Sequence, residues 1–182
     1  MPPTALRADA RRNRERILKA ARSVFADQGI DAQIDDVARR AKVGVGTVYR
    51  HFPTKELLLD AIVREHFDAI AEMARESLQD ADGWAGFCRM IWRAAERNAA
   101  DRSLCEVMTG RDKSDVVVEC GLADMTAELM ARAKAQGAMR ADAARDDVSV
   151  MMIGASAVMQ ALPGEAPWRR HIELMLDGLR AS

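Results

Sequence analysis

The feature that most limits the possible folds is a set of short helix patterns separated by glycine within the first 55 residues. Helices are predicted over 10–28, over 34–41 and from just after Gly44 through Phe52, and Gly29 ends the first of them. Two short helices joined by a brief turn that contains glycine form a helix-turn-helix. The apolar residues of the first helix follow the i, i+1, i+4, i+7, i+8 spacing of one face: Ile17, Leu18, Ala21, Val24 and Phe25.

The remaining sequence predicts longer helices and no strands. The composition is 49% hydrophobic and 30% charged, with only five prolines, and alanine, leucine, methionine, arginine and glutamate dominate. Thr54 is a good N-cap for a long helix that begins at Lys55. We therefore expect an all-α chain of about nine helices, with a three-helix domain in 1–54 and a larger helical domain in 55–182. The later helices are expected over 55–79, around Trp84–Ala95, and over 101–110, 115–136, 147–162 and 166–180.

The sequence does not indicate a membrane span, a signal peptide, a disulfide framework, a metal site or a cofactor. No apolar run reaches the roughly 18 residues that span a bilayer, and the N-terminus has no apolar signal-peptide core, so we expect a cytoplasmic protein. Three cysteines at wide spacing suggest reduced thiols rather than a disulfide framework. The three histidines are far apart in the sequence, so we expect no metal site, and nothing suggests a cofactor.

The net charge of −1 conceals an uneven distribution of charge. Residues 1–60 hold 12 Lys/Arg against 8 Asp/Glu, whereas residues 61–182 hold 15 against 20. The first 22 residues alone contain seven cations and two acids. A basic end on an otherwise acidic chain indicates a polyanion partner at that end, although basic arms are often merely solvated.

The third predicted helix lies in the stretch GVGTVYRHFPTKELL at 44–58 and places unusual side chains toward solvent. Val48 and Phe52 are four residues apart and can share its buried face, so that Tyr49, Arg50 and His51 point outward. The second helix of a helix-turn-helix lies in the DNA major groove, where base edges are exposed. These polar residues suit that position, although for any one of them alone an ordinary exposed side chain is the simpler explanation.

Three specific motifs resemble a known family. Residues 14–63 are similar to the DNA-binding domain of the TetR family of transcriptional repressors through I-L-x-A-A-x-x-x-F-x-x-x-G, D-V-A-x-x-A-x-V and G-T-V-Y-R-H-F-P-T-K. The string Q-G-A-M-R-A-D-x-x-x-x-D-V at 136–148 also resembles the run into that family's penultimate helix. The resemblance implies a homodimer on a palindromic double-stranded DNA operator. It also implies a C-terminal helical domain that binds a small molecule and thereby releases the DNA.

The resemblance assigns roles within the third helix and just after it. Thr47, Tyr49, His51 and Lys55 match the habitual DNA-contacting positions, with His51 and Lys55 mainly on phosphates. A cation such as Lys55 opposes the helix dipole at a helix N-terminus, and a nearby phosphate would explain it. The positions that vary in the family and read the operator are Val45, Gly46 and Arg50.

This chain departs from the family pattern in two ways. The stretch GIDAQIDD is one residue shorter than the commonest spacing and lacks the usual Thr or Ser cap of the second helix. Val45 and Gly46 carry no side-chain hydrogen-bonding group. We therefore hypothesise sparse direct readout, in which Val45 packs on a thymine methyl, Gly46 permits close approach and Arg50 makes the main polar contact.

The C-terminal part holds ten of the eleven methionines. Core filling is the simpler explanation, because methionine fills irregular gaps well. The resemblance, however, places a ligand pocket on the inward stripes of these helices. The expected lining, which suits a largely apolar effector, is Phe67, Phe87, Ile91, Met108, Met125 and Leu129.

The helix predicted over 147–162 is apolar nearly all round and must be buried all round. Its inward face holds Val148, Met151, Met152, Ala155 and Met159. A subunit interface is the simplest burial for the opposite face, and the alternative is the central helix of a monomer. With the last helix it would form a four-helix contact about a two-fold axis. The expected interface residues are Val150, Ile153, Gly154, Ala157, Val158, Ala161, Met175 and Leu179.

The function that these patterns favour is a sequence-specific DNA-binding transcriptional regulator, specifically a repressor that a small apolar ligand releases. An enzyme is the main competing class, but the chain has no glycine-rich phosphate loop, metal-spaced cluster or nucleophile motif. Two further alternatives stay open: a helix-turn-helix regulator without an effector, and one that responds to oxidation of a cysteine. The candidate thiols are Cys88, Cys105 and Cys120, with Cys88 and Cys105 considered first.

Overall fold

The computed structural model describes residues 3–100 and 114–181, and within those two ranges it contains nine α-helices and no strands. This confirms the all-α prediction. None of the described helices is both long enough and apolar enough to cross a membrane. The helices are α1 (Pro3–Gln28), α2 (Ile34–Ala41), α3 (Val45–His51), α4 (Lys55–Ser77), α5 (Gly83–Ala100), α7 (Ser114–Glu119), α8 (Leu122–Ala135), α9 (Arg145–Ala161) and α10 (Ala166–Leu179).

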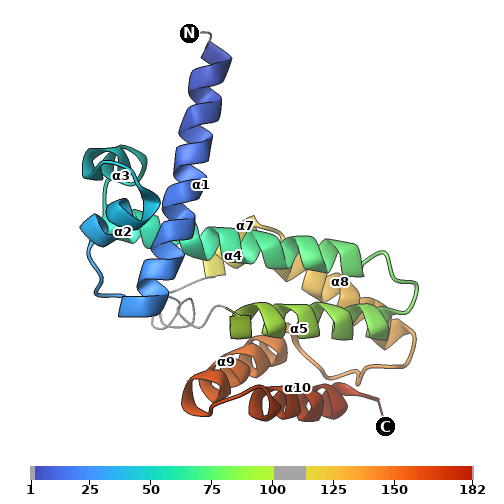
Figure 1. Cartoon of the computed structure of the whole chain (residues 1–182). Coiled ribbons are helices and arrows are strands. Elements are labelled where there is room, and N and C mark those ends of the chain that lie inside the picture. The colour runs from blue at the N-terminus through green and yellow to red at the C-terminus, as the bar shows by residue number, and fades with distance from the viewer. Residues whose placement is uncertain (1–2, 101–113, 182) are drawn as a thin grey trace.

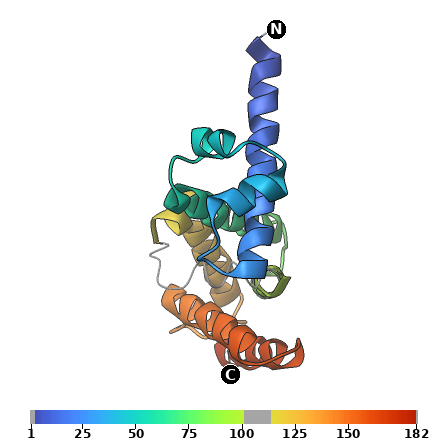
Figure 2. The same ribbon diagram turned by 60° about the vertical axis from the view of Figure 1, so that its left-hand side comes forward.

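The N-terminal helices form a small unit with its own core, which we call the head. Helices α1, α2 and α3 and the first half of α4 surround it, and the N-terminal turns of α1 project beyond it (Figures 1 and 2). The predicted helical faces of 17–25 and 34–41 are both buried there. The buried residues of the head core include Ile17, Leu18, Phe25, Val37, Val48, Phe52, Leu58 and Ile62.

The end of α2, where the turn to α3 begins, is capped by a left-handed residue and by an arginine side chain. Lys42 adopts a left-handed conformation at the end of α2, with φ of 55°, and the Arg16 guanidinium donates to the carbonyl oxygens of Ala41 at 2.7 Å and Lys42 at 3.3 Å. The last carbonyls of a helix have no partner within it, so this arginine satisfies them. Thr54 caps α4 as expected, since its hydroxyl accepts a hydrogen bond from the Leu57 N–H at 3.2 Å.

The second core, which we call the body core, lies among α4, α5, α8, α9 and α10. The inward face predicted for 147–162 is confirmed, because Val148, Met151, Ala155 and Met159 are buried there and Met152 is half-buried. Figure 1 shows α9 and α10 stacked below α5, at the end of the molecule opposite the N-terminus. The largest fully buried members of this core are Phe87, Ile91, Leu129, Met151 and Ile172.

The single helix expected over 115–136 is wrong. The structure has two helices there, α7 and α8, because Gly121 between them takes a φ of 74° that an ordinary helical residue does not adopt. The short helix expected over 101–110 lies outside the described residues.

Helix α4 belongs to both cores. Leu58, Leu59, Ile62 and Val63 lie in the head core, the body core begins on this helix at Ile70, and Phe67 packs against both. The domain boundary expected after residue 54 therefore falls at the start of a helix that both units share. The division into 1–54 and 55–182 stays a prediction.

We predict opposite effects on stability for two glycine-to-alanine substitutions in the body. A Cβ at Gly86 would lie 2.7 Å from the Ser77 carbonyl oxygen and 3.1 Å from a Leu129 methyl, whereas a Cβ at Gly178 meets nothing within 4 Å. Gly86→Ala should lower the free energy of unfolding by about 1–3 kcal/mol through overpacking. Gly178→Ala should raise it by up to about 1 kcal/mol, because glycine disfavours the helix. Urea denaturation followed by circular dichroism measures both, and a neutral Gly86→Ala would contradict the close packing of α5.

Candidate nucleic-acid interface and effector region

Helix α3 presents most of its predicted DNA-contacting side chains to solvent. Val48 and Phe52 are buried in the head core and hold the helix in place. On the outer surface, Tyr49 is 46% exposed and Val45 is 37% exposed. Gly46 and Arg50 are exposed as well, and Thr47 and His51 are half-buried. The structure thus brings six of the seven predicted DNA-binding residues onto one seven-residue helix.

Arg50 is folded back along α3 in this structure. Its Nε donates to the Gly46 carbonyl oxygen at 3.1 Å, and its Nη2 lies 3.4 Å from Thr47 Oγ1. Both contacts are local and exposed, so they cost little to exchange for another acceptor. The Arg50 guanidinium therefore lies along the exposed side of α3, beside Gly46 and Thr47.

The seventh residue, Lys55, joins Tyr49 at a hollow between α2, α3 and α4. The hollow has a volume of about 470 Å³. The Lys55 ammonium group lies 5.8 Å from the centre of the Phe25 ring, a cation–π contact, and Asp36 on the opposite rim is paired with Arg39 at 2.8 Å. Gln33, at the N-cap of α2, makes no side-chain cap, as the missing Thr or Ser predicted. The rim residues are Gln33, Ile34, Asp35, Asp36, Arg39, Tyr49 and Lys55.

Several cations of the basic N-terminus have structural partners that the sequence did not reveal. Arg16 caps α2, as described above. Arg22 lies 3.2 Å from Glu65 on α4, and Arg14 lies 4.0 Å from the same carboxylate. Arg11, on the projecting part of α1, is 77% exposed and lies 3.7 Å from Glu15 of the same helix. The positive charge near the head therefore serves partly to attach α1 to α4.

The residues expected to line an effector pocket are mostly packed in the body core. Phe87, Ile91 and Leu129 are at most 1% exposed, whereas Phe67 and Met125 are half-buried at the edge of that core. Met108 lies outside the described residues.

Buried polar groups accompany these apolar residues. Asn98 lies on the same face of α5 as Ile91, and its Oδ1 is buried without a hydrogen-bond partner. Thr126 is buried on α8, where its hydroxyl donates to the Leu122 carbonyl oxygen at 2.7 Å. A buried acceptor without a partner is costly, so it marks a place where a ligand donor would be stabilising.

Exposed apolar side chains gather at two places. The described part of the chain has eight large ones: three on α3 and the start of α4, four on or beside α9 and α10, and Val118 on α7. The second group contains Val150 and Ile153, which are 63% and 66% exposed. The predicted interface residues Ala157 and Ala161 are also exposed, and Gly154 and Val158 are half-buried. Exposed apolar side chains that gather on one helix in this way form a candidate interaction surface.

The two α10 residues predicted for the interface, Met175 and Leu179, pack against the body core instead of facing solvent. Leu179 is 6% exposed and belongs to the body core, because it continues the inward stripe of Trp168, Ile172 and Leu176. Met175 is half-buried against the same core. Leu174, which the sequence analysis did not select, is 53% exposed.

Cys88, one of the candidate redox thiols, is half-buried in this structure. Burial raises its pKa to about 11, and nearby Arg180 lowers it only partly. A thiol must ionise to react, so this environment makes Cys88 inert at neutral pH. Cys120 is also half-buried, and Cys105 lies outside the described residues. The described residues contain no group of three His, Cys, Asp or Glu side chains that could hold a metal ion.

Comparison with known proteins agrees with this geometry. Residues 17–62 match the family described as bacterial regulatory proteins, tetR family, and residues 81–181 match the C-terminal domain of SbtR-like transcriptional regulators. The first match covers the helix-turn-helix, and the second covers more than half of the chain. The protein belongs to the TetR family of transcriptional regulators.

Individual relatives show where the similarity concentrates. The transcriptional repressor KstR of Mycobacterium tuberculosis is 38% identical over 104 residues, which are 54% of this chain and 46% of KstR. The regulator SrpR of Pseudomonas putida is 45% identical over 62 residues, 32% of this chain and 29% of SrpR. The chain spans about half the length, or less, of the curated relatives it matches.

Solved structures extend the similarity over the whole chain. A TetR transcription regulatory protein from Mycobacterium vanbaalenii is 32% identical, with a TM-score of 0.68 over 97% of this chain and 99% of its own. The TetR regulator SCO0520 of Streptomyces coelicolor is 28% identical, with a TM-score of 0.69 over 93% of this chain and 99% of its own.

We predict slow, pH-dependent alkylation of Cys88. In a Cys105→Ser/Cys120→Ser variant, about one Cys88 thiol in a thousand should be ionised at pH 8, so the iodoacetamide rate should rise about tenfold per pH unit up to pH 10. The same variant unfolded in urea is the control, and its thiol should show the ordinary pKa of about 8.5. A folded-state rate that levels off below pH 9 would contradict the assignment.

Proposed function

We propose that the protein is a DNA-binding repressor that grips a palindromic operator as a homodimer and leaves it when a small, largely apolar ligand binds. The observation that carries this proposal is α3, a short helix anchored by Val48 and Phe52 whose outer side carries aromatic, cationic and imidazole groups. Family membership supports the same function. Similar proteins include the transcriptional repressor KstR of Mycobacterium tuberculosis and the transcriptional regulator FadR of Bacillus subtilis, whose crystal structure is a complex with stearoyl-CoA.

One part of the proposed DNA-binding surface contacts phosphates, and another part contacts base edges. Tyr49 and Lys55 share the hollow at the start of α2, where a phosphate can accept from the phenol and pair with the ammonium. Thr47 and His51 extend these phosphate contacts along α3. Arg50 lies on the exposed side of α3. It is the main candidate for a base contact, since Val45 and Gly46 offer no polar side chain.

The proposed dimer uses the exposed apolar face of α9 together with Leu174 of α10. Val150, Ile153, Ala157 and Ala161 repeat along one side of α9 and are exposed in a single chain. Burying this face against its two-fold copy removes apolar surface from water and gives two α3 helices a fixed separation. A palindromic site with half-sites about one helical turn apart, or a multiple of that spacing, would match such a pair.

The proposed effector enters the body near Phe67 and Met125, which lie at the edge of the core. Phe87, Ile91 and Leu129 are closely packed, so a ligand among them must displace side chains and shift α4, which carries the head. The buried Asn98 Oδ1 favours an apolar effector with at least one hydrogen-bond donor. The competing function, a regulator without an effector, would keep this core closed and its operator affinity unchanged by any ligand.

Selection from a random DNA library with the purified full-length protein tests this function. We expect one enriched palindrome whose affinity falls steeply as salt rises. Arg50→Ala should relax preference at one definable base position in each half-site, by about 1–3 kcal/mol. Lys55→Ala should instead weaken all sequences alike and lower the salt slope by about one.

Arg75→Ala is the matched control, because Arg75 lies far along α4 in an exposed pair with Glu72. It should leave both affinity and motif unchanged. Absence of any enriched sequence would refute the proposed function. An unchanged motif for Arg50→Ala would refute only the readout assignment.

A further inference from the structure

A cation, two indole rings and two carboxylates meet where α5 approaches the N-terminal part of α10. The Arg169 guanidinium carbon lies 4.6 Å from the centre of the Trp168 ring and 5.9 Å from that of Trp92. The two indoles are 6.3 Å apart, with an interplanar angle of 57°. Trp168 is buried and Trp92 is half-buried, so both provide rigid aromatic surfaces.

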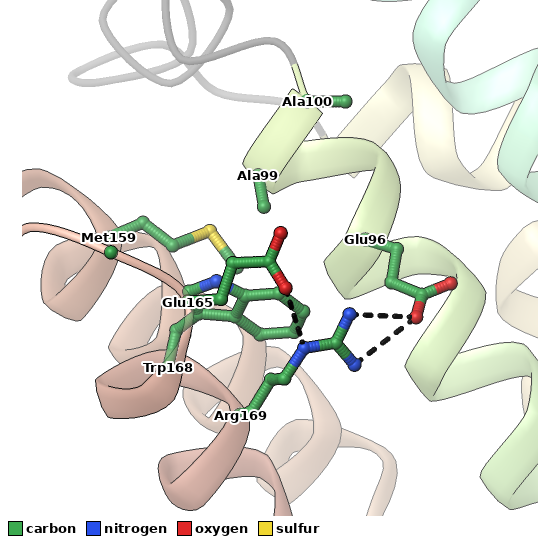
Figure 3. A pocket seen from close by; sticks show the side chains of 8 residues that line it. Glu96, Ala99, Ala100, Met159, Glu165, Trp168 and Arg169 are labelled. Carbon is green, nitrogen blue, oxygen red and sulfur yellow. Dashed lines mark hydrogen bonds and ion pairs between the residues drawn. The ribbon is translucent and has the colours of Figure 1, made fainter.

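Two carboxylates hold the same guanidinium from its edges. Arg169 Nε donates to Glu165 at 3.1 Å, and both terminal nitrogens donate to one oxygen of Glu96, at 3.3 and 3.2 Å (Figure 3). The Glu165 and Glu96 side chains are 73% and 50% exposed, and that of Arg169 is 39% exposed. Both ion pairs are open to solvent, so another cation that makes the same hydrogen bonds can compete with this guanidinium for the two carboxylates.

A pocket of about 380 Å³ adjoins this cluster. Met159 and Trp168 form an apolar side of it, the carboxylates of Glu96 and Glu165 stand near its rim, and Figure 3 shows Arg169 between them. The backbone of Gly164, whose φ of 85° turns the chain between α9 and α10, borders the opening. The volume lies within the range of small-ligand sites. Five of the residues expected to line the effector pocket belong to the part of the chain that the structure describes, and none of these five borders it.

We propose that this pocket is a second ligand site, distinct from the effector region, and that it takes a flat organic cation such as an aromatic amidine or guanidine. The cationic group replaces Arg169 between Glu96 and Glu165. The aromatic part lies against Trp168 and the Met159 thioether.

The chemistry of the lining selects a cation over an anion. Among the lining residues that the structure describes, two are acidic and one is basic, and the basic residue is already paired with both acids. The faces of indole rings carry negative quadrupole charge, which attracts cations and repels anions. Arg169 itself shows that a planar cation fits between these groups, since its guanidinium contacts both carboxylates and the Trp168 ring.

Isothermal titration of the DNA-free protein with benzamidine tests the site, with benzamide as the neutral isostere. We expect benzamidine to bind and benzamide to bind at least about tenfold more weakly, because only the amidinium replaces the ion pairs. Arg169→Gln should bind benzamidine about tenfold more tightly than the unaltered protein, because it removes the internal competitor. A purely structural role for Arg169 predicts no such gain.

Glu96→Gln/Glu165→Gln should lose at least about tenfold in affinity, whereas Glu173→Gln, from an exposed pair with Arg170 on the same helix, should not change it. Thermal melts followed by circular dichroism confirm that each variant is folded. Equal binding of benzamide and benzamidine would overturn the proposal, and so would failure of folded Arg169→Gln to bind benzamidine. Because no DNA is present, neither result depends on whether the protein is a repressor.

Discussion

Helix α4 contributes buried residues to both hydrophobic cores, and it therefore couples the position of the head to the packing of the body. Leu58–Val63 complete the head, Ile70–Ala74 join the body, and Phe67 touches both. Two adjacent charged residues reinforce this arrangement, because Glu65 pairs with Arg22 on α1 while Arg64 pairs with Glu119 on α7. A displacement of α4 by a ligand in the body therefore moves α1 and, through the head core, the orientation of α3. This is how the proposed effector would reach the DNA surface without contacting it.

Much of the head could be predicted from the sequence, because its signals are local. The spacing from Ile17 to Phe25, the glycine between α2 and α3, and the Thr54 cap each act within one or two helical turns. The same holds for the outward position of Tyr49 and Arg50, which follows once Val48 and Phe52 are buried. The inward face of α9 could also be predicted, since Val148, Met151, Ala155 and Met159 repeat at helical spacing.

What the sequence could not show depends on which elements pack together. The attachment of Arg22 to Glu65 joins residues 43 positions apart, and that of Arg169 to Glu96 joins residues 73 apart. Helical spacing does not reveal such pairs. Leu179 and Leu174 are both apolar residues of α10, and the first is buried in the body core whereas the second is exposed. Glycine is unfavourable inside a helix, so Gly121 could have indicated a break, but a single helix was predicted across it.

In the proposed dimer, two copies of this chain pair through α9 and α10 and present two α3 helices to one operator. Sedimentation velocity of the purified protein at micromolar concentration measures this pairing. We expect the mass of two chains, dissociation to single chains in Ile153→Asp, and no change in Val118→Asp, which alters a similarly exposed apolar residue on α7. Sedimentation of the unaltered protein as a single chain would refute the proposed dimer.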